Sequence, residues 1–386
     1  MKRIGFIINP IAGMGGKVAL KGTDGDEILQ EAIKRGATPI TIHKAKFFFE
    51  GIITLALNEE IEFILPQGEM GEKLFNENPL LAEKIQIKIL SHIPIPTITT
   101  SIDTNHVAKE LKGLKVDLII FVGGDGTAQD IYTAIGSKTP ILGIPSGVKI
   151  HSGVFAQSTS KAIEIIKKFA SDQVEFTEGE IIDLDEDAFR KGILNTKLYG
   201  TVLVPQIPSL MQLTKSSTIY TDQEKDNIQG IIRTLRKEIS QNSLYLLGSG
   251  STIKDIAQAF GNEIYLNKTL LGIDLVYKNE IIKSDVSESE ILYTLDLYPE
   301  IQKKLLITPI GGQGFILGRG NQQLSPKVIE KIGCSAIQVI ATKSKINNLP
   351  NRILHIDTGD PDLDKQLTSY QKVLVDYNEY WMIMVD

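Results

Sequence analysis

The sequence contains a single cysteine, Cys334, among 386 residues. One cysteine cannot form an intramolecular disulfide, which excludes a disulfide-stabilised fold and favours a reducing, cytoplasmic setting. Long hydrophobic runs are also missing, since no stretch approaches the roughly 18 apolar residues that a membrane-spanning helix needs. The stretch MKRIGFIINP starts with basic residues, but its apolar run stops at Asn9, too early for a signal-peptide core. We therefore expect a soluble protein whose first apolar run is a strand.

The sequence also lacks an excess of basic residues, with 41 Lys and Arg against 47 Asp and Glu. The formal net charge is −6, which disfavours nucleic acid as the main partner because phosphate backbones require a basic surface. The five histidines and one cysteine show no metal-ligand spacing, so no zinc site is indicated. The aromatic run FFFE at 47–50 is interpreted as the buried face of a helix, because no basic amphipathic stretch supports docking to a membrane.

The first 175 residues have the pattern of a doubly wound α/β domain. Short apolar runs rich in Ile, Leu and Val alternate with helical patterns, and several runs are apolar without alternation, as in strands buried on both faces of a parallel sheet. The candidate strands are 4–9, 38–43, 61–66, 85–90, 116–122 and 140–145. We expect helices on both faces of this mostly parallel sheet.

The pattern changes after residue 175. We assign residues 176–330 to a second, mixed α/β domain, with two strands joined by an acidic turn and a long helix that begins with a capping box of Thr221 and Glu224. Its apolar positions recur at helical spacing, at Ile228, Ile231, Ile232, Leu235 and Ile239. Residues 331–386 contain the strand-like runs AIQVIA and RILHID and a terminal hairpin, and we expect this segment to pack back on the core.

Four strands of the first domain end in loops marked by glycine or proline: NPIAGMGG, PQGEMGE, GGDGT and PSGVKIHSG. Ligands of open α/β sheets bind outside the carboxyl ends of the strands, so we expect these loops to converge on one crevice. Lys149 is a candidate phosphate contact, whereas His151 is interpreted as a structural, hydrogen-bonded histidine. Three further candidates come from the same loops: Gly68, Ser146 and Gly147.

In the GGDGT loop one acidic residue, Asp125, lies among glycines, which have no side chain. Glycines permit close approach of a ligand, and the start of the next helix offers N–H groups to an anion, so Gly123, Gly124 and Gly126 predict a phosphate seat. Thr127 is expected to cap that helix. An acid beside phosphates is electrostatically unfavourable unless it has a function. Asp125 is therefore expected either to bind Mg²⁺ through water or to accept a proton from an attacking hydroxyl. The alternative is a tight turn in which Asp125 caps local N–H groups.

Later in the chain, GSGST and GGQGFILGRGNQQ are the other candidate ligand loops. Either Ser251 or Thr252 is expected to cap a helix after a strand, and the alternative is a plain turn. Arg319 offers planar donors to carboxylate or phosphate, and the alternative is a hairpin with glycine turns. Asp274 interrupts an apolar strand, which is unfavourable unless the acid is paired or used. The remaining candidates of these loops are Gly248, Gly311, Gly312, Gln313 and Asn321. Asp183 and Asp185 are interpreted as an exposed turn.

The stretches NPIAG, GGDGT and GIPSGV together resemble the superfamily of NAD kinases, diacylglycerol kinases and sphingosine kinases. Over nearly its full length the chain is most similar to the ATP-NAD kinase-like branch, which includes acetoin-catabolism accessory proteins. The stretches that carry this second resemblance are PQGEMGE, GIPSGVKIHSGVFA, TPIGGQGFILGRGNQQLSP and HIDTGDPDLD.

The resemblance implies that the first domain binds ATP with Mg²⁺, that Asn9 and Gly13 lie near the nucleotide, and that Asp125 is the base. The acceptor in NAD kinases is the adenosine ribose 2′-OH of NAD, and such kinases are often homo-oligomers. The chain departs from them in two respects. It has no clear Asn-Glu pair in a strand context, and GSGST is followed by Ile253 rather than by Ala-Tyr.

Three functions follow from these features. The first is a Mg²⁺-dependent phosphotransferase that acts on NAD or a similar nucleotide. The second is a kinase for a lipid or another small alcohol, which predicts a deep apolar acceptor pocket. The third is an accessory protein that senses NAD(H) or ATP without turnover, which predicts tight binding, no product, and binding that is indifferent to Asp125→Asn.

Overall fold

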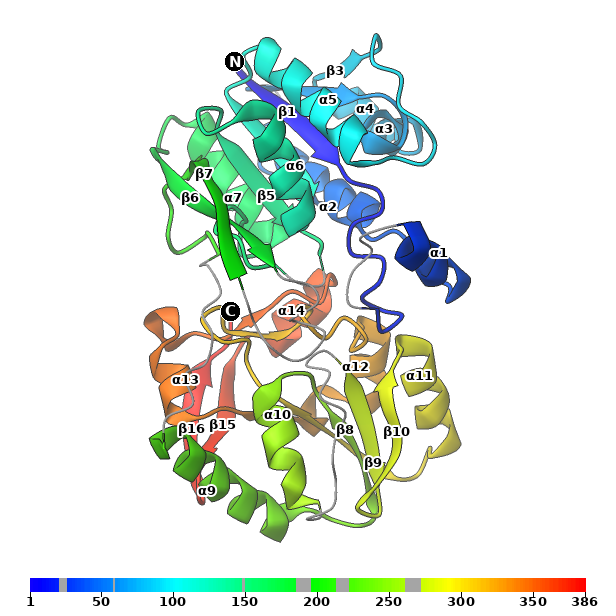
Figure 1. Ribbon diagram of the computed structural model, residues 1–386, viewed down its shortest axis with the longest axis vertical. Coiled ribbons are helices and arrows are strands. Elements are labelled where there is room, and N and C mark those ends of the chain that lie inside the picture. The colour runs from blue at the N-terminus through cyan, green and yellow to red at the C-terminus, as the bar shows by residue number, and fades with distance from the viewer. Residues whose placement is uncertain (21–25, 58–59, 148–149, 185–195, 213–221, 261–271) are drawn as a thin grey trace. The chain divides into compact units, whose positions relative to one another are not determined.

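The computed structural model describes residues 1–20, 26–57, 60–147, 150–184, 196–212, 222–260 and 272–386. The chain divides into two compact units (Figure 1). Unit 1 comprises Met1–Met14, Gly22–Asp185 and Thr196–Thr214, and unit 2 comprises Gly15–Lys21, Glu186–Asn195 and Lys215–Asp386. Among the described residues, no helix has the length and apolar character required to cross a bilayer.

Unit 1 contains a five-stranded, fully parallel sheet in the order β3-β2-β1-β4-β5. Its strands are β1 (Lys2–Ile8), β2 (Ile61–Pro66), β3 (Ile87–Leu90), β4 (Leu118–Gly123) and β5 (Ile141–Pro145). An antiparallel ribbon of β6 (Phe176–Leu184) and β7 (Thr196–Pro205) follows. All residues of β4 and β5 are buried, as the unbroken apolar runs predicted. The α/β class of this domain is thus confirmed.

The helices of unit 1 are α1 (Asp26–Lys34), α2 (Thr41–Thr54), α3 (Glu72–Asn76), α4 (Pro79–Lys84), α5 (Ser101–Gly113), α6 (Asp125–Ile135) and α7 (Thr159–Ala170). Residues 38–43 are not a strand as expected, because α2 begins at Thr41. The reason is burial at helical spacing: Ala45, Phe48, Phe49 and Ile52 face the sheet together. The buried interpretation of the aromatic run is confirmed.

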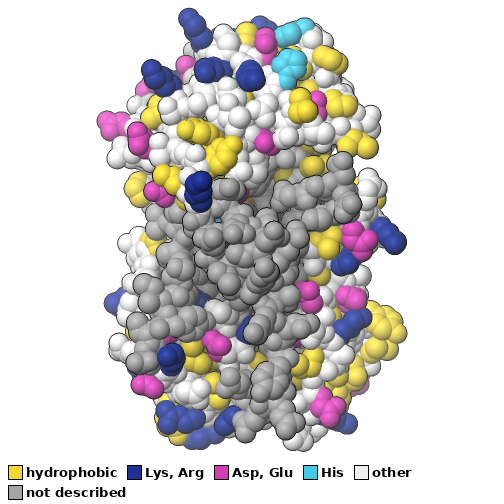
Figure 2. Space-filling model, viewed as in Figure 1, with side chains coloured by type: hydrophobic (Ala, Val, Ile, Leu, Met, Phe, Trp, Pro, Cys, Tyr) yellow, Lys and Arg dark blue, Asp and Glu magenta, His cyan; other side chains and the backbone are white. Residues whose placement is uncertain are grey.

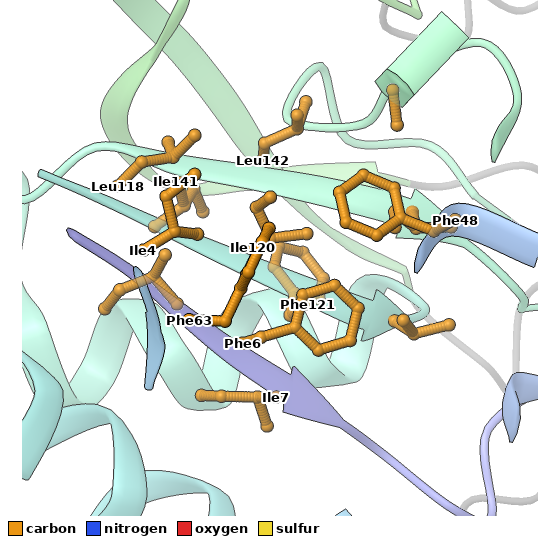
Figure 3. Packing of buried hydrophobic residues seen from close by; sticks show 14 of the residues in the cluster. Ile4, Phe6, Ile7, Phe48, Phe63, Leu118, Ile120, Phe121, Ile141 and Leu142 are labelled. Carbon is orange, nitrogen blue, oxygen red and sulfur yellow. The ribbon is translucent and has the colours of Figure 1, made fainter. Parts of the chain in front are cut away.

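The core of unit 1 is aromatic where α2 meets the sheet (Figure 3). The Phe6 ring of β1 lies 5.4 Å from the ring of Phe48, measured between centroids, and Phe63 of β2 packs edge-on against both rings. Tilted and edge-to-face pairs of this kind stabilise a core beyond the burial of their area. The packing fixes α2 against β1 and β2, and so fixes the strand ends from which the loops depart.

Unit 2 contains a seven-stranded mixed sheet in the order β10-β9-β8-β11-β13-β15-β16. The strands are β8 (Ser243–Leu247), β9 (Ile273–Tyr277), β10 (Glu280–Val286), β11 (Gln302–Ile307), β13 (Ile337–Ile340), β15 (Tyr370–Asp376) and β16 (Glu379–Met384). Of these, β8, β11, β13 and β15 are parallel to one another, and β9, β10 and β16 pair antiparallel. The short strands β12 (Phe315–Leu317) and β14 (His355–Ile356) pair separately. The expected terminal hairpin is β15–β16.

Two groups of helices cover the two faces of this sheet. One apolar cluster joins α9 (Asp222–Glu238) and α10 (Ser251–Ile256) to one face. A second cluster joins the other face to α11 (Glu288–Leu297), α12 (Pro326–Ile332), α13 (Lys343–Asn347) and α14 (Pro361–Leu367). The predicted apolar stripe of α9 is confirmed, with Ile228, Ile231, Ile232 and Leu235 buried. Thr221 of the expected capping box lies outside the described residues.

The outer surface is mixed in character. On the face shown in Figure 2, acidic, basic and hydrophobic side chains are interspersed over the described part of unit 2, and several Lys or Arg side chains lie over unit 1 near the top of the view. Interspersed charges of both signs are the pattern of an ordinary solvated surface.

Candidate active site

In unit 1 the strand order reverses between β1 and β4: β2 and β3 continue to one side of β1, while β4 and β5 continue to the other. Because all five strands are parallel, the loops after β2, β1, β4 and β5 leave the same edge of the sheet. Ligands in open α/β sheets bind at such a reversal. The predicted NPIAG and GGDGT loops flank it directly.

Asn9 joins these two loops. Its Nδ2 donates to Thr127 Oγ1 at 2.8 Å, its Oδ1 accepts from Ile11 N at 3.2 Å, and its own N–H donates to Val122 O at 3.0 Å. The prediction that Thr127 caps a helix was wrong, since α6 begins at Asp125 and Gly124 precedes it. The Thr127 hydroxyl oxygen instead accepts the hydrogen bond from Asn9 Nδ2, 118 residues away in the sequence.

The half-buried Asp125 carboxylate is held by the loop that follows β5. Oδ2 accepts from His151 N at 2.7 Å, and Oδ1 accepts from Ser152 N at 3.0 Å. The backbone N–H groups that donate to Asp125 therefore come from residues distant in sequence and not from its own turn. Hydrogen bonds to a carboxylate favour its charged form. Each oxygen has a second lone pair, so the group can accept a further proton or contact a cation.

The loop that holds Asp125 is itself fixed from behind. Gln212 Nε2 donates to Ile150 O at 3.1 Å and to Ser152 O at 3.4 Å, and Ser152 Oγ accepts from Ile182 N at 3.0 Å. Sequence reasoning missed both Ser152 and Gln212. Nothing in the pattern around Gln212 points to the loop, because 60 residues separate Gln212 from Ser152.

Five predicted residues bring three of the loops into contact: Gly13, Gly123, Gly124, Ser146 and Gly147. Gly13 has φ +77°, and a Cβ there would lie 1.8 Å from Ser146 O, so only glycine fits. Ser146 N donates to Gly123 O at 2.9 Å. The Ser146 hydroxyl is buried and has no hydrogen-bond partner among the described residues. A Cβ at Gly124 would lie 3.3 Å from Gly147 Cα. The first, fourth and fifth strands thus bring their loops into contact.

Two other predicted residues are less informative. Gly68 follows β2 with φ +56°, and a Cβ there would have no neighbour closer than 3.9 Å, at Ile95. Its N–H donates to Glu72 Oε2 at 3.2 Å. Lys149 lies outside the described residues. His151 is buried, and its backbone N–H donates to Asp125 Oδ2. The interpretation of its side chain as a structural, hydrogen-bonded histidine stays a prediction.

The candidates of the later loops gather in unit 2. Gly248 N donates to Leu306 O at 2.8 Å, and Ser249 Oγ donates to Gly320 O at 2.8 Å, so the two glycine-rich loops touch. The prediction that Ser251 or Thr252 caps α10 was wrong, because that helix begins at Ser251 and Gly250 precedes it.

Asp274 of β9 is paired rather than isolated. The Lys254 ammonium of α10 donates to its carboxylate, and Asp285 N donates to its Oδ1 at 3.0 Å. The residue is buried. Of the two interpretations, paired or used, the contacts establish the pairing. Asp183 lies within β6, and Asp185 is outside the described residues.

The GGQGFILGRGNQQ loop is held in place by contacts of its own polar residues. The Arg319 guanidinium lies 4.2 Å from the centre of the Phe315 ring, and its Nε is 3.9 Å from Asp357 Oδ2. Asn321 Nδ2 donates to Ile316 O at 2.8 Å. Gly311 and Gly312 are partly exposed in the turn that precedes the buried Gln313. The alternative of a hairpin was wrong, because β12 in this stretch pairs in parallel with β14. The contact of Arg319 and Asn321 with a ligand stays a prediction.

The described residues contain no group of three or more His, Cys, Asp or Glu side chains arranged to hold a metal ion. Mg²⁺ does not need such a group, since it is commonly bound by one or two carboxylates together with substrate phosphates and water. Asp125, in the loop that is predicted to seat phosphate, can supply such a carboxylate.

Comparisons with known families agree with the layout of the chain. Residues 4–174 match the family model of the ATP-NAD kinase N-terminal domain, and residues 241–385 match that of the ATP-NAD kinase C-terminal domain. Together the two matches cover more than four fifths of the sequence. No curated protein and no solved structure matches the chain.

Proposed function

The chain belongs to the ATP-NAD kinase family, and on that premise we propose that it transfers the γ-phosphate of ATP to the 2′-OH of NAD. The observation that carries the proposal is the placement of Asp125. Its carboxylate stands at the reversal of strand order, in the glycine loop, and two backbone N–H groups fix its position. In this proposal residues 1–175 form the nucleotide-binding domain, and residues 176–330 serve acceptor binding or oligomerisation.

Phosphoryl transfer depends mainly on positioning and on stabilisation of charge, because the phosphoryl group itself is the electrophile. The backbone N–H groups of His151 and Ser152 fix the Asp125 carboxylate, and a carboxylate oxygen takes the proton of the acceptor hydroxyl. The bare backbone of Gly123 and Gly124 offers N–H groups to phosphate oxygens. Asn9 holds the first loop against the second. Bound Mg²⁺ would neutralise charge on the ATP phosphates.

A second function is favoured by one specific observation. The two hydrogen bonds to Asp125 also make it a strut between α6 and the loop after β5. In an accessory protein that binds NAD(H) or ATP without turnover, Asp125 would have only this structural role. The two functions differ in whether product forms, and in what Asp125→Asn changes.

The test is an incubation of the pure protein with NAD, ATP and Mg²⁺, in which NADP is detected by a coupled dehydrogenase. Parallel reactions contain Asp125→Asn, or polyphosphate in place of ATP. NADP from the wild type but not from the variant supports both the kinase and its base. NADP from both proteins removes Asp125 as the base. Nucleotide binding by calorimetry without NADP contradicts NAD as the acceptor and favours the accessory function or another hydroxyl. We also expect a homo-oligomer, which sedimentation analysis measures.

A further inference from the structure

The β15–β16 hairpin turns at Tyr377 and Asn378 and packs beside α9 (Figure 1). Asn378 N donates to Thr234 Oγ1 of α9 at 2.7 Å. A Cβ at Gly230 would lie 2.0 Å from Asp376 Oδ1, so the missing side chain lets the helix approach the turn closely. The turn is therefore fixed against α9 by contacts that do not involve the Tyr377 side chain.

Two basic residues of α9 flank the Tyr377 phenol. Lys237 Nζ donates to the phenol oxygen at 2.6 Å and lies 4.7 Å from the centre of the ring. The Arg233 guanidinium lies 5.3 Å from the same centre. Residues four apart lie on one side of a helix, so both cations face the same ring. Tyr377 is 43% exposed, and its side chain is therefore accessible from solvent while the two cations flank it.

The acids of the hairpin do not compete for these two cations. Lys343 of α13 pairs with both of the acids that border the turn, Asp376 at 3.0 Å and Glu379 at 2.7 Å. Within the described part of the chain, neither Arg233 nor Lys237 has a carboxylate partner. The charge of the α9 pair therefore acts mainly on the phenol.

The two tyrosines of the hairpin have opposite surroundings. The hydrogen bond and the charge of Lys237 lower the pKa of Tyr377, and the charge of Arg233 acts in the same direction. Tyr380 instead donates to the Glu238 carboxylate, and burial together with this carboxylate raises the pKa of Tyr380. At a given pH, a larger share of Tyr377 than of Tyr380 is therefore phenolate, the form of tyrosine that attacks electrophiles.

We propose that Tyr377 is a modification site, at which an acyl phosphate acylates the phenol oxygen. This class of acyl donor fits because it carries a phosphate dianion, which Arg233 and Lys237 attract. The oxygen attacks the carbonyl carbon, the ester bond to tyrosine forms, and the bond from that carbon to the phosphate oxygen breaks. The phenol proton ends on the departing phosphate, so no further reactant is needed. The site uses no residue of the Asp125 crevice and so goes beyond the proposed function.

The test is a competition among the tyrosines of the full-length protein. The protein reacts with acetyl phosphate or with N-acetylimidazole, an acyl donor without a phosphate, and peptide mass spectrometry follows acetylation at each tyrosine. Neutral hydroxylamine cleaves acetyl groups from tyrosine oxygen but not from lysine nitrogen, and so identifies the ester. Tyr293 and Tyr370 are the internal controls. They are 66% and 65% exposed, and neither side chain contacts a cation among the described residues.

We expect Tyr377 to react about threefold or more faster than the two exposed controls with acetyl phosphate, because each exposed ion pair raises the phenolate share by about two- to fivefold. Lys237→Met and Arg233→Met should each remove most of this advantage. Lys365→Met, which changes an exposed lysine of the same unit, should leave it intact. Raising the salt concentration to about 0.5 M should slow the reaction with acetyl phosphate more than the reaction with N-acetylimidazole, because salt screens the attraction of the dianion.

The pH dependence gives a second readout. The rate at Tyr377 should level off at lower pH in the wild type than in Lys237→Met, whereas Tyr380 should stay unmodified in both. Circular dichroism and thermal unfolding establish that each variant is folded, and Arg233→Met keeps the test open if Lys237→Met is not.

Three results would overturn the proposal. The first is that Tyr377 reacts with acetyl phosphate no faster than Tyr293 and Tyr370. The second is that neither Lys237→Met nor Arg233→Met slows the reaction at Tyr377. The third is selective reaction with N-acetylimidazole alone, which would show a nucleophilic phenol that does not take acyl phosphates.

Discussion

Replacement of Asp125 by Asn distinguishes a catalytic role of the carboxylate from a purely structural one. The carboxylate accepts from two N–H groups, at 2.7 Å from His151 and 3.0 Å from Ser152. An amide has one acceptor oxygen and one donor NH₂ group, so it can satisfy only one of the two N–H groups. The substitution therefore has two consequences, loss of a proton acceptor and loss of one hydrogen bond, and each has its own magnitude.

Leaving one partly buried N–H group without an acceptor costs about 1–3 kcal/mol of stability. Loss of a general base costs roughly 10²–10⁴ in rate. The matched control is Ser152→Ala, which removes the acceptor of Ile182 N at 3.0 Å but leaves the Asp125 carboxylate in place. It disturbs the same loop and should cost a similar amount of stability, about 1–3 kcal/mol.

The assay combines urea unfolding with the rate of NADP formation at saturating ATP and NAD. We expect both variants to lose comparable stability, whereas only Asp125→Asn loses kcat by about 10²–10⁴. Ser152→Ala should stay within about tenfold of the wild type, because the Asp125 carboxylate keeps both of its backbone N–H donors, at His151 and at residue 152. Equal kcat values for the two variants would refute the assignment of Asp125 as the base and leave it as a strut.

Three further predictions concern stability and are measured by urea unfolding. Gly13→Ala should cost at least about 1–2 kcal/mol and weaken ATP binding, because φ is +77° and the new Cβ would meet Ser146 O at 1.8 Å. Phe48→Ala should cost about 3–5 kcal/mol through lost core packing, and a cost below about 1 kcal/mol would contradict the packing described. Lys343→Met should cost less than about 1 kcal/mol, since the lysine is partly exposed beside Glu379 (2.7 Å) and Asp376 (3.0 Å). Hydrogen bonds from Lys343 to Glu379 and Asp376 raise the pKa of the lysine, and the same contact lowers the pKa of Glu379. The contribution of Glu379 to stability is lost as pH falls through its lowered pKa. The contribution of Lys343 is lost as pH rises through its raised pKa. The free energies of unfolding of wild type and variant should therefore differ most between about pH 5 and 10.

Apolar periodicity was enough to predict much of the sheet structure. Strands β4 and β5 are unbroken apolar runs because helices cover both faces. The terminal hairpin follows from two strand-like runs of mixed polarity on either side of Tyr377 and Asn378. The same signal failed at 38–43, where a short apolar run fits a strand or a buried helix equally well. Phe48 and Phe49 decide the matter through contacts with Phe6 and Phe63, which a local window does not contain.

The glycine loops were correctly placed at strand ends, but the roles of their hydroxyls were not. Thr127 and Thr252 both follow glycines at a helix start, which is the local pattern of a cap. In the folded chain the two hydroxyls receive hydrogen bonds from Asn9 and Lys345, which are 118 and 93 residues away. Such partners come together only through strand order. The same reason hides Gln212, whose amide fixes the loop that holds Asp125.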